Sequence, residues 1–168
     1  MTGQRGAMFI LIGFAGLLLV IAVFSGWQGA SRLSDRSDDS AAVEDAARTF
    51  VEAFGTFDYR APERHRERLL LLSTGSVLAV TANSAVDPVA VGQRRVTSTH
   101  VVSSSVSALS VDGAAVSVTA EQIRRGTDPE SGEAIEEYVL QRVNCRLVSE
   151  DNRWLVAEFR LLSEEPLK

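Results

Sequence analysis

Residues 137–149, EYVLQRVNCRLVS, decide the fold, because apolar and polar side chains alternate along them and predict a long β-strand. One face of this strand carries Val139, Val143, Cys145 and Leu147. The period of two begins at Gln93 and predicts three further strands, which are Arg94 to Leu109, Ala114 to Arg124 and Arg153 to Leu162. Asp112-Gly113 and Glu150-Asp151-Asn152 predict tight turns, whereas residues 126–133, GTDPESGE, predict a longer loop. Four sequential strands with these connections predict an antiparallel meander.

Helical periodicity precedes the strands. Apolar side chains recur at three- and four-residue steps from Val43 to Phe57 and predict an amphipathic helix that ends after Gly55. Pro62 suits the first turn of a second helix that runs to Leu72 and stops at Ser73-Thr74-Gly75. Residues 76–92 contain two chain breakers and predict a short helix and a loop. We therefore expect the α+β class, with two or three helices packed on a curved four-stranded antiparallel sheet.

The amino-terminal region predicts a membrane anchor. Ala7 to Phe24, AMFILIGFAGLLLVIAVF, is a run of eighteen uncharged residues, and about 20 apolar residues cross a bilayer as one helix. A cleaved signal peptide is the alternative, but Val23-Phe24-Ser25 is a weak cleavage site. We expect a cytoplasmic tail over residues 1–6, a single transmembrane anchor over 7–27, a linker over 28–40 and an extracytoplasmic domain over 41–168. The domain would then lie outside the cell membrane, although the arginines that flank the anchor give this orientation no support.

Composition and motifs exclude several function classes. A net charge of −5 argues against a nucleic-acid partner. The single cysteine, Cys145, lies in an apolar strand, where a buried and inert thiol is expected. The two histidines, His65 and His100, lie about 35 positions apart without a carboxylate at ligand spacing, so no metal site is expected. No phosphate loop, nucleophile motif or dinucleotide fingerprint occurs, and we expect neither a cofactor nor catalytic residues.

Several short segments carry a family resemblance: Ala46 to Phe50, Thr56 to Arg60, Arg64 to Leu71 with Thr74-Gly75, and Asn152 to Val156. In this order they resemble membrane-anchored bacterial domains of the NTF2-like, cystatin-like α+β roll. Gly92 to Val96 and the arginine-rich second helix look like the VirB8/TcpC-like subunits of conjugative type IV secretion. TFDYR at residues 56–60 and Leu72 to Gly75 look more like the accessory proteins of Mce lipid import.

The resemblance implies a non-catalytic assembly subunit of a bacterial envelope machine, and the conjugative branch is our preferred interpretation. Its partners would be the membrane, other envelope-complex proteins and further copies of the chain. The Mce-associated branch is the alternative. A third hypothesis is a small apolar-ligand binder or isomerase-like enzyme, since some NTF2-like folds hold an acid–base pair in a cone-shaped pocket. The residues offered for such a pocket are Asp58, Tyr59, His100 and Tyr138, although Asp58 and Tyr59 also suit a helix end.

Two surface features are candidates for partner contacts. Arg60, Arg64, Arg66 and Arg68 form the strongest charge cluster, and it could meet anionic headgroups or an acidic partner. Interleaved Glu63 and Glu67 favour a self-paired, solvated helix face instead, with His65 solvated among the arginines. The uncharged run Val101 to Val111 would invite strand addition if it lay at a sheet edge.

Overall fold

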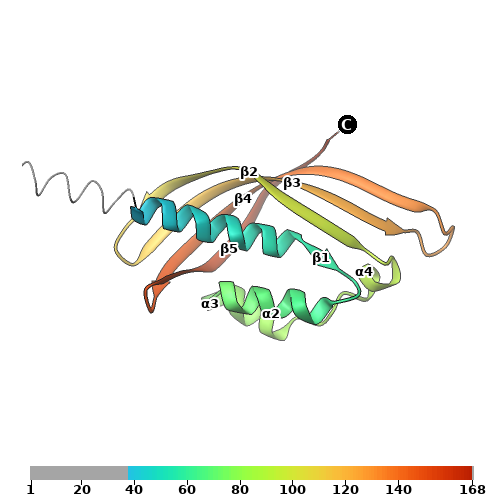
Figure 1. The fold of residues 1–168 in the computed structure, drawn as a ribbon, viewed down its shortest axis with the longest axis horizontal. Helices are drawn as coiled ribbons and strands as arrows, with labels where there is room; N and C mark the ends of the chain where they lie inside the picture. The colour runs from blue at the N-terminus through green and yellow to red at the C-terminus, as the bar shows by residue number, and fades with distance from the viewer. Residues whose placement is uncertain (1–37, 168) are drawn as a thin grey trace, which may run out of the picture. The chain divides into compact units, whose positions relative to one another are not determined.

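The sheet is an antiparallel meander, as the alternating pattern predicts. In a computed structural model that describes residues 38–167, the long strands are β2 (Val96–Leu109), β3 (Gly113–Thr127), β4 (Ala134–Glu150) and β5 (Arg153–Pro166). A two-residue strand, β1 (Phe57–Asp58), pairs with the beginning of β2, so the sheet has five strands in the order β1-β2-β3-β4-β5 rather than the expected four. The strands curl strongly, and the helices lie on the concave side (Figure 1).

The helices follow the predicted boundaries closely until residue 73. Residues 38–55 are helical, and α2 spans Pro62–Leu72. The expectation of one short helix and a loop over residues 76–92 is wrong, because this stretch forms two short helices, α3 (Gly75–Asn83) and α4 (Pro88–Gly92). Asp87 produces the second helix, since its side chain accepts a 2.9 Å hydrogen bond from the backbone N–H of Val89 at the helix start.

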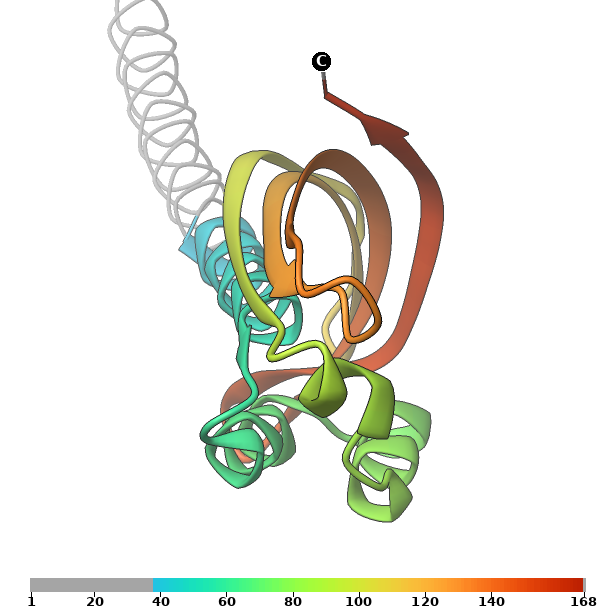
Figure 2. The same cartoon turned by 90° about the vertical axis from the view of Figure 1, so that its right-hand side faces the viewer.

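The hydrophobic core lies between the 38–55 helix and the concave face of the sheet. Val43, Ala47 and Phe50 repeat at helical spacing and are fully buried. They pack on the apolar residues of β3 and β4, of which Val116 and Leu147 are also fully buried. Figure 2 shows the helix beside the curled strands, next to β2. The period of two in the strands thus places every second side chain against one helix face.

The end of the 38–55 helix approaches the sheet closely at Gly55. Its carbonyl oxygen accepts hydrogen bonds from the Oγ1 of Thr97, at 2.6 Å, and from the Nε2 of Gln122, at 2.9 Å. A Cβ at position 55 would overlap the side chain of Thr99. Glycine is therefore required here by the contact between the helix end and the strands.

Replacement of Gly55 tests this contact. We expect Gly55→Ala to lower the free energy of unfolding by about 1–3 kcal/mol, because the added methyl group overpacks the contact with Thr99. Gly92→Ala is the matched control, since a Cβ at position 92 meets nothing within 4 Å, and it should change stability by less than about 0.5 kcal/mol. Urea unfolding followed by circular dichroism measures both; equal stabilities of the two variants would contradict the close approach.

Cys145 is fully buried in β4 between the helix and the sheet. Burial raises the pKa of its thiol to about 12, because the charged thiolate loses its hydration. At pH 8 only about one thiol in ten thousand is then ionised. The thiol has the inert character that the sequence predicts.

The reactivity of Cys145 gives a second test. We expect the folded protein to resist alkylation by iodoacetamide at pH 8 and to react readily once urea unfolds it. Mass spectrometry of the quenched reaction measures the modified fraction. Rapid labelling of the folded chain would contradict the burial of this residue.

The predicted anchor over residues 7–27 and most of the predicted linker lie outside the described residues. Within residues 38–167, no helix is both long and apolar enough to span a bilayer. The compact unit Ser40–Lys168 contains the sheet and the helices α2 to α4.

Candidate functional site

A cavity of about 580 Å³ opens where the apolar core ends. Its floor is the polar part of the concave sheet face, and its other walls are the end of the 38–55 helix, α2, α3, the segment 84–87 and α4. The apolar lining residues include Phe54, Phe57, Leu69, Val80 and Val86. The polar and charged ones include His65, Arg66, Asp87, Arg95, Thr97, Gln122, Arg124 and Gln141. The cavity is thus apolar on its helical side and polar on its sheet side.

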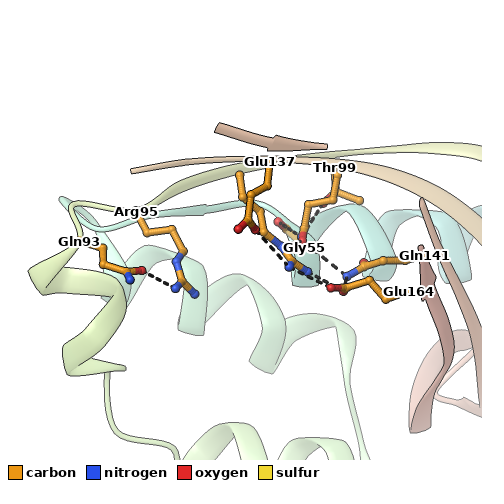
Figure 3. A network of polar contacts seen from close by, with 9 residues as sticks. Gly55, Gln93, Arg95, Thr99, Glu137, Gln141 and Glu164 are labelled. Atoms are coloured by element: carbon orange, nitrogen blue, oxygen red, sulfur yellow. Dashed lines mark hydrogen bonds and ion pairs between the residues drawn. The ribbon is translucent and has the colours of Figure 1, made fainter. Parts of the chain in front are cut away.

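Two polar residues of the floor are buried, since the surfaces of Gln122 and Thr97 are each only 7% exposed. The amide of Gln122 joins the floor to the long helix. Its amide nitrogen donates to the Gly55 carbonyl and to the Oγ1 of Thr99, at 2.9 and 3.1 Å. Its amide oxygen accepts a 2.6 Å hydrogen bond from the Nε of Arg124. Figure 3 shows its two acceptors, Gly55 at the helix end and Thr99 on β2, close together in this network. Both ends of the buried amide are therefore satisfied by other parts of the chain.

Arg124 is held in turn by a carboxylate from β5. Its two terminal nitrogens donate to both oxygens of Glu164, at 3.0 and 2.6 Å, in a bidentate pair. The Nε2 of Gln141 donates to the same carboxylate at 2.7 Å (Figure 3). Hydrogen bonds from Arg124 and Gln141 hold the pKa of Glu164 below its ordinary value. The carboxylate nearest the floor is consequently ionised and engaged at neutral pH.

His65 lies in the cavity wall rather than in solvent, which corrects the expectation from its arginine neighbours. Its Nδ1 donates to the Thr56 carbonyl oxygen at 2.9 Å, and its ring meets Phe57 edge-on at 5.5 Å. Burial lowers the pKa of His65. The hydrogen bond to Thr56 opposes this shift, and the positive charge of Arg68 adds to it. The ring is therefore neutral at pH 7 and joins α2 to the helix end.

Arg66 also departs from the expected outward orientation of the arginine cluster. It lines the cavity and donates a hydrogen bond to the carbonyl of Ala82 in α3. Its Nε is buried and has no hydrogen-bond partner within residues 38–167. One guanidinium nitrogen of Arg66 lies 3.9 Å from the carboxylate of Glu63. This ion pair is the only one within α2 that supports the expected self-paired face. Arg66 thus links two helices at the cavity mouth.

The remaining arginines of the cluster are exposed, as expected. Arg60 lies over the ring of Tyr59, 5.5 Å from its centre, and 3.4 Å from the carboxylate of Asp58. Arg64 and Arg68 form no ion pair with any residue of the described part of the chain. Their charges are available to solvent or to a partner.

The four residues offered for a pocket are not brought together, and none of them lines the cavity. Asp58 accepts a hydrogen bond from the backbone N–H of Arg60, at 2.9 Å, and shapes the turn before α2. Tyr59 lies in the same turn, and its N–H donates to the carbonyl of Arg95. His100 is exposed on β2, and Tyr138 is exposed on β4, where its hydroxyl donates to Glu136 at 2.9 Å.

The sequence reasoning missed three residues that form the floor, Gln122, Arg124 and Gln141, and the Glu164 carboxylate that holds two of them. Gln122 continues the apolar face of β3 after Ala120, and Gln141 precedes Val143 on the same face of β4. Polar residues at positions where a strand pattern calls for apolar ones are the signal that could have identified the floor. The arrangement holds a neutral imidazole, a paired carboxylate and a helix-capping carboxylate, Asp87, around a space that a small amphipathic molecule fits.

No family model and no curated protein matches the chain. Solved structures do match it. An NTF2-like protein involved in plasmid conjugation superposes with a TM-score of 0.52 at 13% identity, over 79% of this chain and 50% of that chain. The intermembrane space region of the chloroplast protein ARC6 superposes with a TM-score of 0.49 at 18% identity, over 71% of this chain and 96% of that one. An IcmL-like type IV secretion system protein from Legionella pneumophila superposes with a TM-score of 0.46 at 12% identity, over 76% of this chain and 93% of that one.

The likeness to the plasmid-conjugation protein defines the class of this protein at the level of the fold alone. The chain has an NTF2-like α+β roll, as the resemblance in its sequence implied. It spans half the length of the conjugation protein whose fold it shares.

The pairing of Arg124 with Glu164 predicts a pH-dependent contribution to stability. We expect Glu164→Gln to lower the free energy of unfolding by about 1 kcal/mol at pH 7, because the charged pair is lost. A folded-state pKa below the ordinary value contributes stability above about pH 4.3, and this contribution is lost as the pH falls through the folded pKa. The difference between variant and wild type should therefore vanish in acid.

Urea unfolding between pH 3 and pH 7 measures this difference. Glu165→Gln is the matched control, since the neighbouring carboxylate is exposed and forms no ion pair among residues 38–167. A constant difference between Glu164→Gln and wild type across this range would contradict the pairing.

Proposed function

We propose that the chain is a non-catalytic, membrane-anchored assembly subunit of a bacterial envelope machine, of the VirB8/TcpC-like conjugative type IV secretion kind. The observation that carries the proposal is the floor of the cavity. Its polar groups bond to one another and to a neighbouring carboxylate, from the buried Gly55 and Gln122 through the partly exposed Arg124 to Glu164. A catalytic floor would instead leave an acid or base free to reach a substrate. The fold shared with the plasmid-conjugation protein also supports this assignment.

The edge of the sheet at β2 offers a route to a partner. β1 pairs only with Val96 and Thr97, and no strand among the described residues pairs with the outer edge of residues 103–109. The backbone N–H groups of Thr99 and Val101 are occupied by side chains of the preceding helix and its end, Thr56 and Glu52. The open part of the edge is therefore the serine-rich half of β2. An extended segment of another subunit would add there through backbone hydrogen bonds.

A second function is favoured by one specific observation. The buried Nε of Arg66 lacks a hydrogen-bond partner at the wall of a partly apolar cavity. An unpaired buried donor is costly, and a bound molecule with an acceptor would satisfy it. Binding of a small amphipathic molecule in the cavity is therefore the alternative.

A matched pair of serine variants tests the proposal. Ser105 and Ser117 are register partners on β2 and β3, and both are exposed. Lysine at the edge position should block strand addition, whereas lysine at the inner strand should not. We expect subunits of a secretion channel or its coupling ATPase to copurify in mild detergent with the full-length wild type and Ser117→Lys. They should be lost from Ser105→Lys.

Mass spectrometry of the retained proteins and small molecules measures these outcomes. Lipid-transport subunits in place of secretion subunits would overturn the conjugative assignment and favour the Mce-associated one. A chain that purifies without protein partners but with a small molecule would favour the ligand-binding function. Equal retention by the two lysine variants would contradict the role of the β2 edge.

A further inference from the structure

The helical layer formed by α2, α3 and α4 presents an exposed apolar surface. None of the residues of α3 is fully buried, although the helix is uncharged and rich in valine and alanine. Val80 is 68% exposed and Val89 is 57% exposed. Leu71, Val86 and Val91 are exposed as well. Residues 75–93 contain a single charged side chain, Asp87, so little charge interrupts this surface.

The charge of the domain is unevenly distributed. Residues 38–57, which include the long helix, contain one arginine and five carboxylates and carry −4. Residues 58–95, which include the three short helices, contain six arginines and four carboxylates and carry a net charge of +2. Residues 96–168, which include the long strands, contain seven basic and twelve acidic residues and carry −5. The helical layer and the sheet lie on opposite sides of the domain, with the three helices grouped below the sheet (Figure 2). An anionic surface therefore attracts the helical layer and repels the sheet.

We propose that the α2–α4 layer is a docking surface for an anionic lipid bilayer. Leu71, Val89 and Val91, which are exposed and do not line the cavity, enter the interfacial region, and Arg64 and Arg68 contact the headgroup phosphates. Exposed apolar side chains and arginines without ion pairs in one layer match the combination by which peripheral helices bind such membranes, in which apolar burial and electrostatic attraction add. An anionic bilayer selects for positive charge that is confined to this layer, whereas docking of a protein does not require such a distribution.

The geometry of the chain permits this contact. Residues 38–55 form a helix about 27 Å long, and the ten residues 28–37 span at most about 35 Å when extended. A domain tethered at residue 27 can therefore turn its helical layer onto the same bilayer. This step rests on the anchor in the proposed function, whereas the docking surface itself does not depend on which machine the chain serves.

An environment-sensitive dye on the full-length protein tests the surface. The dye is attached to Val89→Cys in α4 or, as the control, to Val111→Cys in the β2–β3 turn, where the valine is 96% exposed. The turn lies at the opposite end of the sheet from α4 (Figure 1). The native Cys145 is buried and stays unlabelled. The protein is reconstituted into vesicles of phosphatidylcholine alone or with phosphatidylglycerol as about a third of the lipid.

We expect the dye at Val89 to shift to the blue and gain intensity several-fold in the anionic vesicles. It should respond weakly in phosphatidylcholine alone, and about 1 M salt should reverse the response. The dye at Val111 should not respond. Arg64→Gln with Arg68→Gln should remove most of the response at Val89, whereas Arg125→Gln with Arg142→Gln, on β3 and β4, should preserve it.

Flotation of the same samples on a density gradient reports attachment to vesicles separately. Floating protein with a silent dye at Val89, or with an equal response at Val111, would overturn the docking surface and leave the anchor intact. Protein that floats with a responding dye at Val89, and that no longer floats once salt is added, would support the docking surface and overturn the anchor. Protein that neither floats nor responds would overturn both.

Discussion

The contact of the helix end with the sheet at Gly55 governs the architecture of this domain. The Gly55 carbonyl is buried and accepts hydrogen bonds from Thr97 in β2 and from Gln122 in β3. Gln122 extends the connection to Arg124, and Arg124 extends it to Glu164 in β5. A buried polar group in a medium of low dielectric requires partners, so each bond depends on the next. One chain of hydrogen bonds thereby joins the long helix to distant strands of the sheet.

The cavity follows from the place where that helix ends. Beyond Gly55 the long helix no longer covers the concave face, and the side chains of the sheet change from valine and cysteine to glutamine, arginine and threonine. The shorter helices α2, α3 and α4 close this region from a greater distance and leave a space of about 580 Å³. Because the polar floor satisfies its own hydrogen bonds, the cavity can exist without a ligand.

The fold could be predicted well from sequence wherever a local pattern determined the structure. Alternation identified the four long strands, and helical spacing with Pro62 identified α2. The two-residue strand β1 was missed because its pairing with Val96 and Thr97 gives no periodicity of its own. The exposure of His65 was misjudged because its arginine neighbours indicate a solvated face, whereas the ring turns toward Phe57. The orientation of Arg66 was misjudged as well, because α3 approaches that face of α2 and Arg66 turns toward the carbonyl of Ala82.

The sequence by itself determined the α+β class, the order of the elements and the buried character of Cys145, because periodicity and chain breakers act over a few residues. It also carried the apolar run at residues 7–24, which predicts the anchor. Only the tertiary structure decided which polar residues meet. Gly55, Gln122 and Glu164 are separated by tens of residues, and they meet because the curl and register of the strands bring them to the end of one helix. No local pattern encodes such a meeting, since it depends on the packing of the whole sheet.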